Sequence, residues 1–286
     1  MTGERERAGP LLPGFRWCLS TLGCAELDLS ETIALAARHG IGELELRALE
    51  DRLDLPAYLA ETFGEPARLR DRLAAAPVRV TVLDTSLRLI GNDARDREAL
   101  LAFIPWAEAL GVPWLRVFDG GELSDAPDRD SMREAVETVR WWQNLRRRNG
   151  WRTDLAMETH DAFCRAESCL ALQDALPEPI AVLWDAHHTW HRGGEALEVT
   201  WPALRPFIRH IHFKDSVPEA NEVNDYTCAV PGEGRFPLAA FFRMIGKDRF
   251  EGALCLEWER KWQPRIPDLA TALAGLRRFQ LESRNP

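Results

Sequence analysis

The stretch IAVLWDAHHTWHRGGEALEVTWPALRPFIRHIHFKD, residues 180–215, contains two apolar runs with a helix-like segment between them. The two runs, residues 180–185 and 208–213, are short and end in polar side chains, as is typical of buried strands. Residues 195–204 between them have the apolar spacing of a helix. Strand, helix and strand in this order predict two parallel strands joined by a helical crossover.

The same alternation extends along the whole chain of 286 residues. Strands are predicted at residues 15–19, 41–46, 78–83, 113–118, 154–158, 180–185, 208–213 and 253–258. Eight such units in roughly 270 residues match the size of a (β/α)8 barrel. An open doubly wound sheet is the rival fold, but no GxGxxG turn follows the first strands. We therefore predict an α/β protein with a single (β/α)8 TIM barrel over residues 14–286, after a flexible tail over residues 1–13.

The bulk composition excludes several classes of protein. The net charge of -9 disfavours nucleic acids and anionic membranes, which bind basic surfaces. The 6 cysteines are scattered without a CxxC pair, and we expect free thiols in a reducing compartment. Neither a secretory segment nor an apolar run of membrane-spanning length is recognisable, so a cytoplasmic location is predicted.

Polar clusters lie at the ends of the last four predicted strands. They are ETH at residues 158–160, DAHH at 185–188, HIHFKD at 210–215 and EWE at 257–259. In a barrel the carboxyl ends of the strands meet at one rim, where such acids would repel one another. A divalent cation resolves the repulsion, because Asp, Glu and neutral His are its ligands. The sequence therefore predicts a metal site at this rim.

Side-chain alternation along a strand gives these clusters a direction. His212 and Lys214 share one face of their strand, and Glu158 and His160 share one face of theirs. The apolar residues between them suit the helical layer, so the polar set is expected to face the barrel mouth.

Two arginines follow the same parity on earlier strands. Arg47 and Arg116 could hydrogen-bond hydroxyl groups, a carboxylate or a phosphate of a substrate. A single acid at a strand end is more often a helix cap or part of a loop ion pair. Four acidic or imidazole ends on consecutive strands are harder to explain in that way.

Five motifs together resemble the sugar phosphate isomerase/epimerase family of the xylose isomerase-like barrel superfamily. They are ETHD at residues 158–161, WDAHH at 184–188, HIHFKD at 210–215, GEGRFP at 232–237 and LEWERKW at 256–262. The resemblance covers nearly the whole chain. One departure is Pro218, which stands where ketose 3-epimerases of the family have an arginine.

The resemblance implies one divalent metal ion, Mn, Mg, Co or Zn, bound by Glu158, Asp185, His212 and Glu257. It also implies that Glu158 and Glu257 move the substrate proton and that His188 contacts the substrate. A homodimer is expected by family.

We predict a metal-dependent sugar or sugar phosphate isomerase or epimerase that transfers a proton next to a carbonyl through an enediolate. His160, His188 and Lys214 would orient the substrate oxygens, and the segments 47–66 and 217–231 would be loops that shape the pocket. The first alternative is a dehydratase of a keto-sugar, an inosose or a dehydroshikimate-like substrate. An AP endonuclease-like protein would need more metal ligands and a basic face, and a non-catalytic sugar-binding module would not need the full ligand set.

Overall fold

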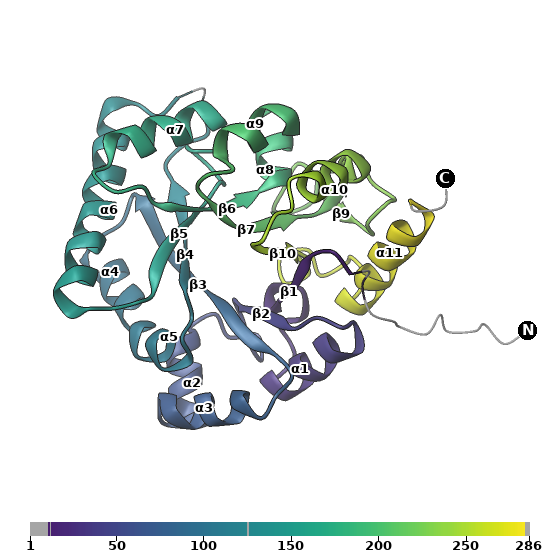
Figure 1. Cartoon of the computed structure of the whole chain (residues 1–286), viewed down its shortest axis with the longest axis horizontal. Coiled ribbons are helices and arrows are strands. Elements are labelled where there is room, and N and C mark those ends of the chain that lie inside the picture. The colour runs from purple at the N-terminus through teal and green to yellow at the C-terminus, as the bar shows by residue number, and fades with distance from the viewer. Residues whose placement is uncertain (1–10, 12, 125, 284–286) are drawn as a thin grey trace, which may run out of the picture. The chain divides into compact units, whose positions relative to one another are not determined.

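The fold is a closed barrel of parallel strands. The computed structural model describes residues 11, 13–124 and 126–283. Within these residues, eight parallel strands close in the order β1-β10-β7-β6-β5-β4-β3-β2 (Figure 1). The predicted α/β class with a single (β/α)8 barrel is therefore confirmed. Most of the predicted tail, residues 1–10 and 12, lies outside the described residues, so its boundary stays a prediction.

The described chain divides into two compact units. The first consists of residues 1–55, 72–79 and 213–286, and the second of residues 56–71 and 80–212, as far as the structure describes them. Helix α2 (Leu55–Phe63) belongs to the second unit except for its first residue, and α3 (Pro66–Ala74) belongs to it up to residue 71.

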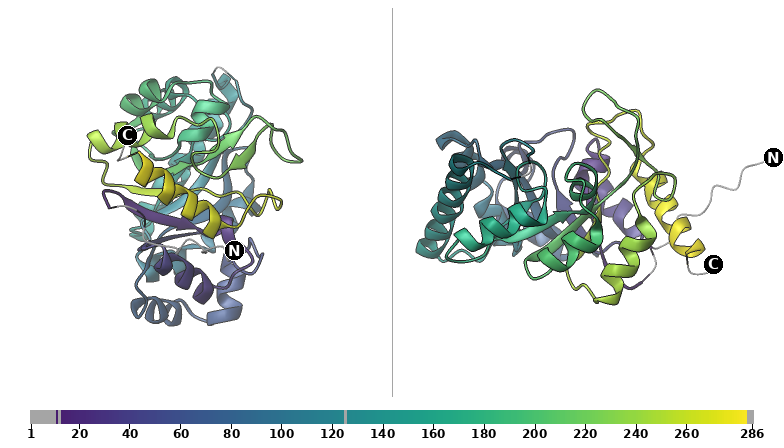
Figure 2. Two further views of the ribbon diagram at one scale, coloured as in Figure 1. Left: turned by 90° about the vertical axis from the view of Figure 1, so that its right-hand side faces the viewer. Right: turned by 90° about the horizontal axis from the view of Figure 1, so that it is seen from above.

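The first unit contains strands β1 (Arg16–Ser20), β2 (Glu43–Leu46) and β10 (Ala253–Leu256). Strand β1 pairs in parallel with both of the others. The short 3-10 helix η1 (Thr21–Cys24) follows β1, and α1 (Leu29–Arg38) begins at a capping box between Asp28 and Glu31. Helices α10 (Leu238–Lys247) and α11 (Leu269–Glu282) are the yellow-green and yellow helices of Figure 2. They pack through Phe242 and Phe279, whose ring centroids are 6.2 Å apart.

The second unit holds a run of parallel strands with helices outside them. Its strands are β3 (Arg79–Ile90), β4 (Trp114–Gly120), β5 (Asp154–Glu158), β6 (Ala181–Asp185) and β7 (Ile208–Phe213). Its helices are α4 (Ala94–Leu101), α5 (Ile104–Leu110), α6 (Arg129–Asn149), α7 (Ala166–Ala175), α8 (Ala186–His191) and α9 (Leu197–Leu204). Figure 1 shows α6, α7 and α9 on the outer side of β4, β5 and β6.

Several short elements differ from the sequence prediction. The apolar spacing of residues 93–110 predicts one helix, but the structure has two, because Pro105 lacks an N–H and suits the first turn of α5 better than the interior of a longer helix. Part of the predicted loop 47–66 is α2. In the predicted loop 217–231, strand β9 (Thr227–Ala229) pairs antiparallel with β8 (Asp215–Val217).

Two expectations from composition can be compared with the structure. All 6 cysteines are buried free thiols, as predicted. Among the helices in the described residues, none has the length and apolarity needed to cross a bilayer.

A buried carboxylate organises the loop that contains the GEGRFP motif. Asp215 accepts backbone N–H bonds from Ser216, Gly232, Gly234 and Phe236 at 2.9–3.0 Å. Burial raises the pKa of Asp215, while these N–H donors act in the opposite direction. The Asp of HIHFKD therefore holds the GEGRFP loop.

The close approach at Gly234 gives a test of this arrangement. A Cβ atom there would overlap Asp215 Oδ1 and lie 2.6 Å from the Ser216 nitrogen. We expect Gly234→Ala to lower the free energy of unfolding by about 1–3 kcal/mol, the usual effect of overpacking. Chemical denaturation measures this change. Gly42→Ala is the matched control, because a Cβ at Gly42 would meet no atom within 4 Å; equal losses in both variants would contradict the interpretation.

Candidate metal centre

Three of the predicted ligands end three adjacent strands of the second unit. Glu158 is the last residue of β5, Asp185 is the last residue of β6, and His212 lies on β7 in register with Asp185. Their side chains are at most 1% exposed. Each offers a ligand atom, and these atoms lie within 4.8 Å of one another. His212 Nδ1 is 3.5 Å from Glu158 Oε1.

Asp185 has a second role that explains the local sequence. Its Oδ1 accepts the N–H groups of His187 and His188 at 2.8 and 2.9 Å, so the strand ends and helix α8 begins at this one residue. Its Oδ2 lies 3.2 Å from His188 Nδ1. The Asp185 N–H donates to the Thr159 hydroxyl at 3.0 Å, which links the ends of β5 and β6.

The chemistry of this donor set fits a divalent cation. Two buried carboxylates at such short range would oppose each other's ionisation in the absence of a positive charge. Oxygen ligands with one imidazole suit hard or borderline ions such as Mg, Mn or Zn. Glu158, Asp185 and His212 could therefore hold a metal ion.

The predicted substrate arginine of β4 is buried beside Glu158. Arg116 Nε lies 3.4 Å from Glu158 Oε2, and Arg116 Nη2 lies 3.4 Å from Asp84 Oδ2. Its guanidinium carbon lies over the Phe118 ring, 4.0 Å from the ring centroid. Arg116 thus balances charge next to a candidate ligand, and its contact with a substrate stays a prediction.

A second buried aspartate shapes the turn after β5. Asp119 accepts N–H bonds from His160, Asp161 and Phe163 at 2.8–3.2 Å and from Gly120 at 2.8 Å. Burial, with a contribution from the charge of Asp161, raises the pKa of Asp119 to about 7. Asp119 therefore sets the position of the His160 backbone.

The predicted substrate histidines lie next to each other in this unit. The ring centroids of His160 and His188 are 4.6 Å apart. His160 Nδ1 lies 3.0 Å from Asp161 Oδ1, which also contacts Arg192 at 3.3 Å. Burial acts to lower the pKa of His160, but Asp161 and the charges of Glu158 and Asp119 outweigh it and raise that pKa.

The remaining predicted site residues belong to the first unit. Lys214 follows β7, has no exposed surface, and its Nζ makes a short ion pair with Glu257 and a 3.1 Å ion pair with Glu259 Oε1. Glu257 directly follows β10. Arg47 directly follows β2, is 6% exposed and donates its N–H to Thr21 Oγ1 at 2.8 Å.

Sequence reasoning missed several polar residues that bond to Arg116, to the turn after β5 or to Glu259. They are Asp84, Asp119, Asn224, Tyr226 and Gln263. Asp119 lies at the end of the fourth strand and had the same strand-end signal as the predicted ligands. The loop residues had no comparable signal.

The family of the chain follows from the comparison of its sequence with known protein families. The family model for the xylose isomerase-like TIM barrel matches residues 33–279. The chain belongs to this family. The resemblance inferred from the five motifs is therefore confirmed, and no curated protein sequence matches the chain.

Several solved structures share the fold of this chain at low sequence identity. The probable 3-DHS dehydratase AsbF of Bacillus anthracis is 17% identical, with a TM-score of 0.74 over 93% of this chain and 99% of its own. The IOLI protein with a bound zinc atom is 14% identical, with a TM-score of 0.74 over 94% and 98%. The 3-keto-D-glucoside 4-epimerase YcjR of E. coli is 12% identical, with a TM-score of 0.65 over 95% and 100%.

The pair of His160 and Asp161 gives a prediction about proton binding. Asp161→Asn removes a negative charge next to the imidazole, so the pKa of His160 should fall, as an NMR titration of its ring protons would measure. A raised folded-state pKa stabilises the protein below the ordinary histidine pKa, and this stability is lost as the pH rises through the raised value. The destabilisation by Asp161→Asn should therefore be larger at about pH 6 than at about pH 9.

The exposed Asp130, which pairs with Arg133 at 2.8 Å, provides the matched control. Asp130→Asn should leave the His160 titration unchanged. An unchanged His160 pKa in Asp161→Asn would show that the ion pair does not control this imidazole.

Proposed function

We propose that this xylose isomerase-like barrel is a divalent-metal-dependent isomerase or epimerase of a sugar or sugar phosphate. The observation that supports the proposal is the buried set of Glu158, Asp185 and His212 at the ends of adjacent parallel strands. Burial of charged carboxylates costs free energy, and a bound cation would offset this cost.

Glu257 is proposed as the fourth ligand. It directly follows β10, which neighbours β7 in the barrel order. Its N–H donates to the Phe213 carbonyl at 3.0 Å, and Phe213 is the residue after His212. This backbone bond supports a place for Glu257 next to the candidate ligand on β7.

The proposed reaction is a proton transfer next to a substrate carbonyl. A bound cation supplies polarisation of that carbonyl. Glu158 or Glu257 removes the proton, and the other glutamate returns one to the enediolate. Return to the opposite face of the same carbon gives epimerisation, and return to the adjacent carbon gives isomerisation.

The proposal assigns the neighbouring polar side chains to substrate binding. His188 and His160 would contact substrate oxygens from one side, and Lys214, Arg47 and Arg116 would bind further hydroxyl or phosphate groups.

Dehydration is the second candidate, and the buried Lys214 favours it. An ammonium group beside the base Glu257 could donate a proton to a departing β-hydroxyl, which leaves as water while the glutamate keeps the α-proton. The similar barrels include a probable dehydratase and an epimerase, so the fold is compatible with either reaction.

Metal binding tests the ligand set without reference to a substrate. We expect the native protein to bind one divalent ion per chain. Asp185→Asn should lower the affinity for Mn²⁺ by at least about 100-fold, because loss of a residue that only supports the ligands usually costs about 10- to 100-fold. Isothermal titration calorimetry of metal-free protein measures this affinity. Asp268→Asn is the control, because Asp268 caps helix α11 in the same way and should not affect the metal. Unchanged affinity in Asp185→Asn would contradict the proposed site.

Isotope exchange distinguishes the candidate reactions. The native protein with Mn²⁺ in D2O, screened over ketoses, inososes and sugar phosphates, should incorporate deuterium without loss of water if it is an isomerase or epimerase. Loss of water detected by mass spectrometry would instead identify the dehydratase. Glu158→Gln and Glu257→Gln should each reduce turnover by about 10²- to 10⁴-fold, as expected for loss of a general base.

The exposed Glu233, paired with Arg278 at 2.8 Å, gives the matched control Glu233→Gln, which should retain turnover. A double variant of Glu158 and Glu257 with full activity would rule out the two-glutamate scheme.

A further inference from the structure

Glu259 is a buried carboxylate with donors on both oxygens. Its Oε1 accepts the Tyr226 hydroxyl at 2.8 Å and lies 3.1 Å from Lys214 Nζ. Its Oε2 accepts Nδ2 of Asn224 at 2.9 Å and Nε2 of Gln263 at 2.8 Å. Three neutral donors therefore hold this carboxylate in place independently of the lysine.

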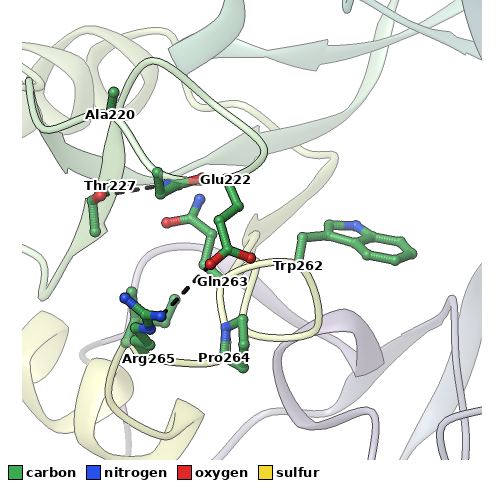
Figure 3. A pocket seen from close by; sticks show the side chains of 9 residues that line it. Ala220, Glu222, Thr227, Trp262, Gln263, Pro264 and Arg265 are labelled. Carbon is green, nitrogen blue, oxygen red and sulfur yellow. Dashed lines mark hydrogen bonds and ion pairs between the residues drawn. The ribbon is translucent and has the colours of Figure 1, made fainter.

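The Glu259 donors come from two loops that are themselves fixed. Gln263 Oε1 accepts the Cys228 N–H at 2.9 Å, and Asn221 Nδ2 donates to the Tyr226 carbonyl at 2.6 Å. These loops border a hollow of about 560 Å³, in which Trp262 points away from Glu222 and Arg265 (Figure 3). The polar groups of Asn221 and Gln263 bond within the loops, so the loops act as a frame for Glu259.

Lys214 is shared between this framed carboxylate and the proposed metal ligand. Its Nζ contacts both Glu257 and Glu259, and none of the three side chains is more than 8% exposed. When Glu257 binds a cation, the ammonium group and the cation become like charges next to one carboxylate. Such charges repel strongly at low solvent exposure, so Lys214 needs another anionic partner.

We propose that Glu259 is the counter-ion that receives Lys214 when Glu257 binds the metal. Glu259 is thus a positioning residue, which acts on the metal through Lys214 and does not itself bind the ion. The proposal rests on the proposed function, because it takes Glu257 as a metal ligand. It assigns a task to the second glutamate of the EWE cluster, which the predicted ligand set leaves without one.

A double-mutant cycle on metal affinity tests the proposal. Glu259→Gln should weaken binding of Mn²⁺ to metal-free protein by about 10- to 100-fold, because Lys214 then stays with Glu257. Lys214→Met should bind Mn²⁺ at least as tightly as the native protein. In the Lys214→Met background, Glu259→Gln should change the affinity by no more than about two-fold, the range of independent sites.

Isothermal titration calorimetry measures all four affinities, and thermal unfolding of the metal-free variants confirms that each is folded. Glu222→Gln is the matched control, because Glu222 lies in the same loop region, is exposed and pairs with Arg265 at 3.6 Å. This variant should bind Mn²⁺ with the same affinity as the native protein. If Glu259→Gln lowered the Mn²⁺ affinity equally in both backgrounds, the effect would be one of long-range charge. That result would overturn the role of Glu259 as counter-ion and leave the proposed metal site unaffected. Failure of the native protein to bind Mn²⁺ would overturn the proposed metal site as well.

Discussion

Charge neutralisation of buried carboxylates is the constraint on which the polar interior of this barrel depends. Parallel strands that end in acids bring like charges into regions with little water, where each carboxylate needs a cation or N–H donors to stay ionised. In the second unit, Glu158 lies beside Arg116 and His212. In the first unit, Glu257 and Glu259 share Lys214. Each of these buried carboxylates is therefore found next to a positively charged or proton-donating side chain.

Two buried aspartates accept hydrogen bonds from backbone N–H groups, and these bonds shape the loops. Asp119 binds the N–H groups of the turn at residues 160–163, and Asp215 binds those of the loop at residues 232–236. Asp119 lies at the end of a strand and Asp215 begins one, while Glu158 and Asp185 are the last residues of theirs. Both oxygens of Asp119 and of Asp215 accept main-chain N–H groups, whereas Asp185 directs only Oδ1 to such donors and its Oδ2 lies beside His188. Asp119 and Asp215 therefore support the site by holding loops. An acidic motif residue can therefore have either a chemical or a structural task.

The sequence predicted the fold and the polar clusters at the strand ends because both depend on local patterns, whereas the resemblance of five motifs to a known family implied which residues are ligands. Strand-end acids and alternating faces are visible in short windows, and the structure places Asp185 in register with His212. Asp84 was missed because β3 continues to Ile90, past the predicted end at residue 83, with an irregularity between Asp84 and Arg88. Tyr226 and Gln263 were missed because isolated loop residues have no periodicity.

Local sequence patterns are sufficient for the order of strands and helices, the types of cluster at the strand ends and the donor atoms available for a cation. The pairing of charged groups depends on the three-dimensional fold. Lys214 and Glu259 are 45 residues apart, and Arg116 and Glu158 are 42 residues apart, by subtraction of their numbers. Their partnership depends on which strand ends and loops become neighbours in space. Periodicity describes the face of one element, and it contains no information about distances between side chains on different elements.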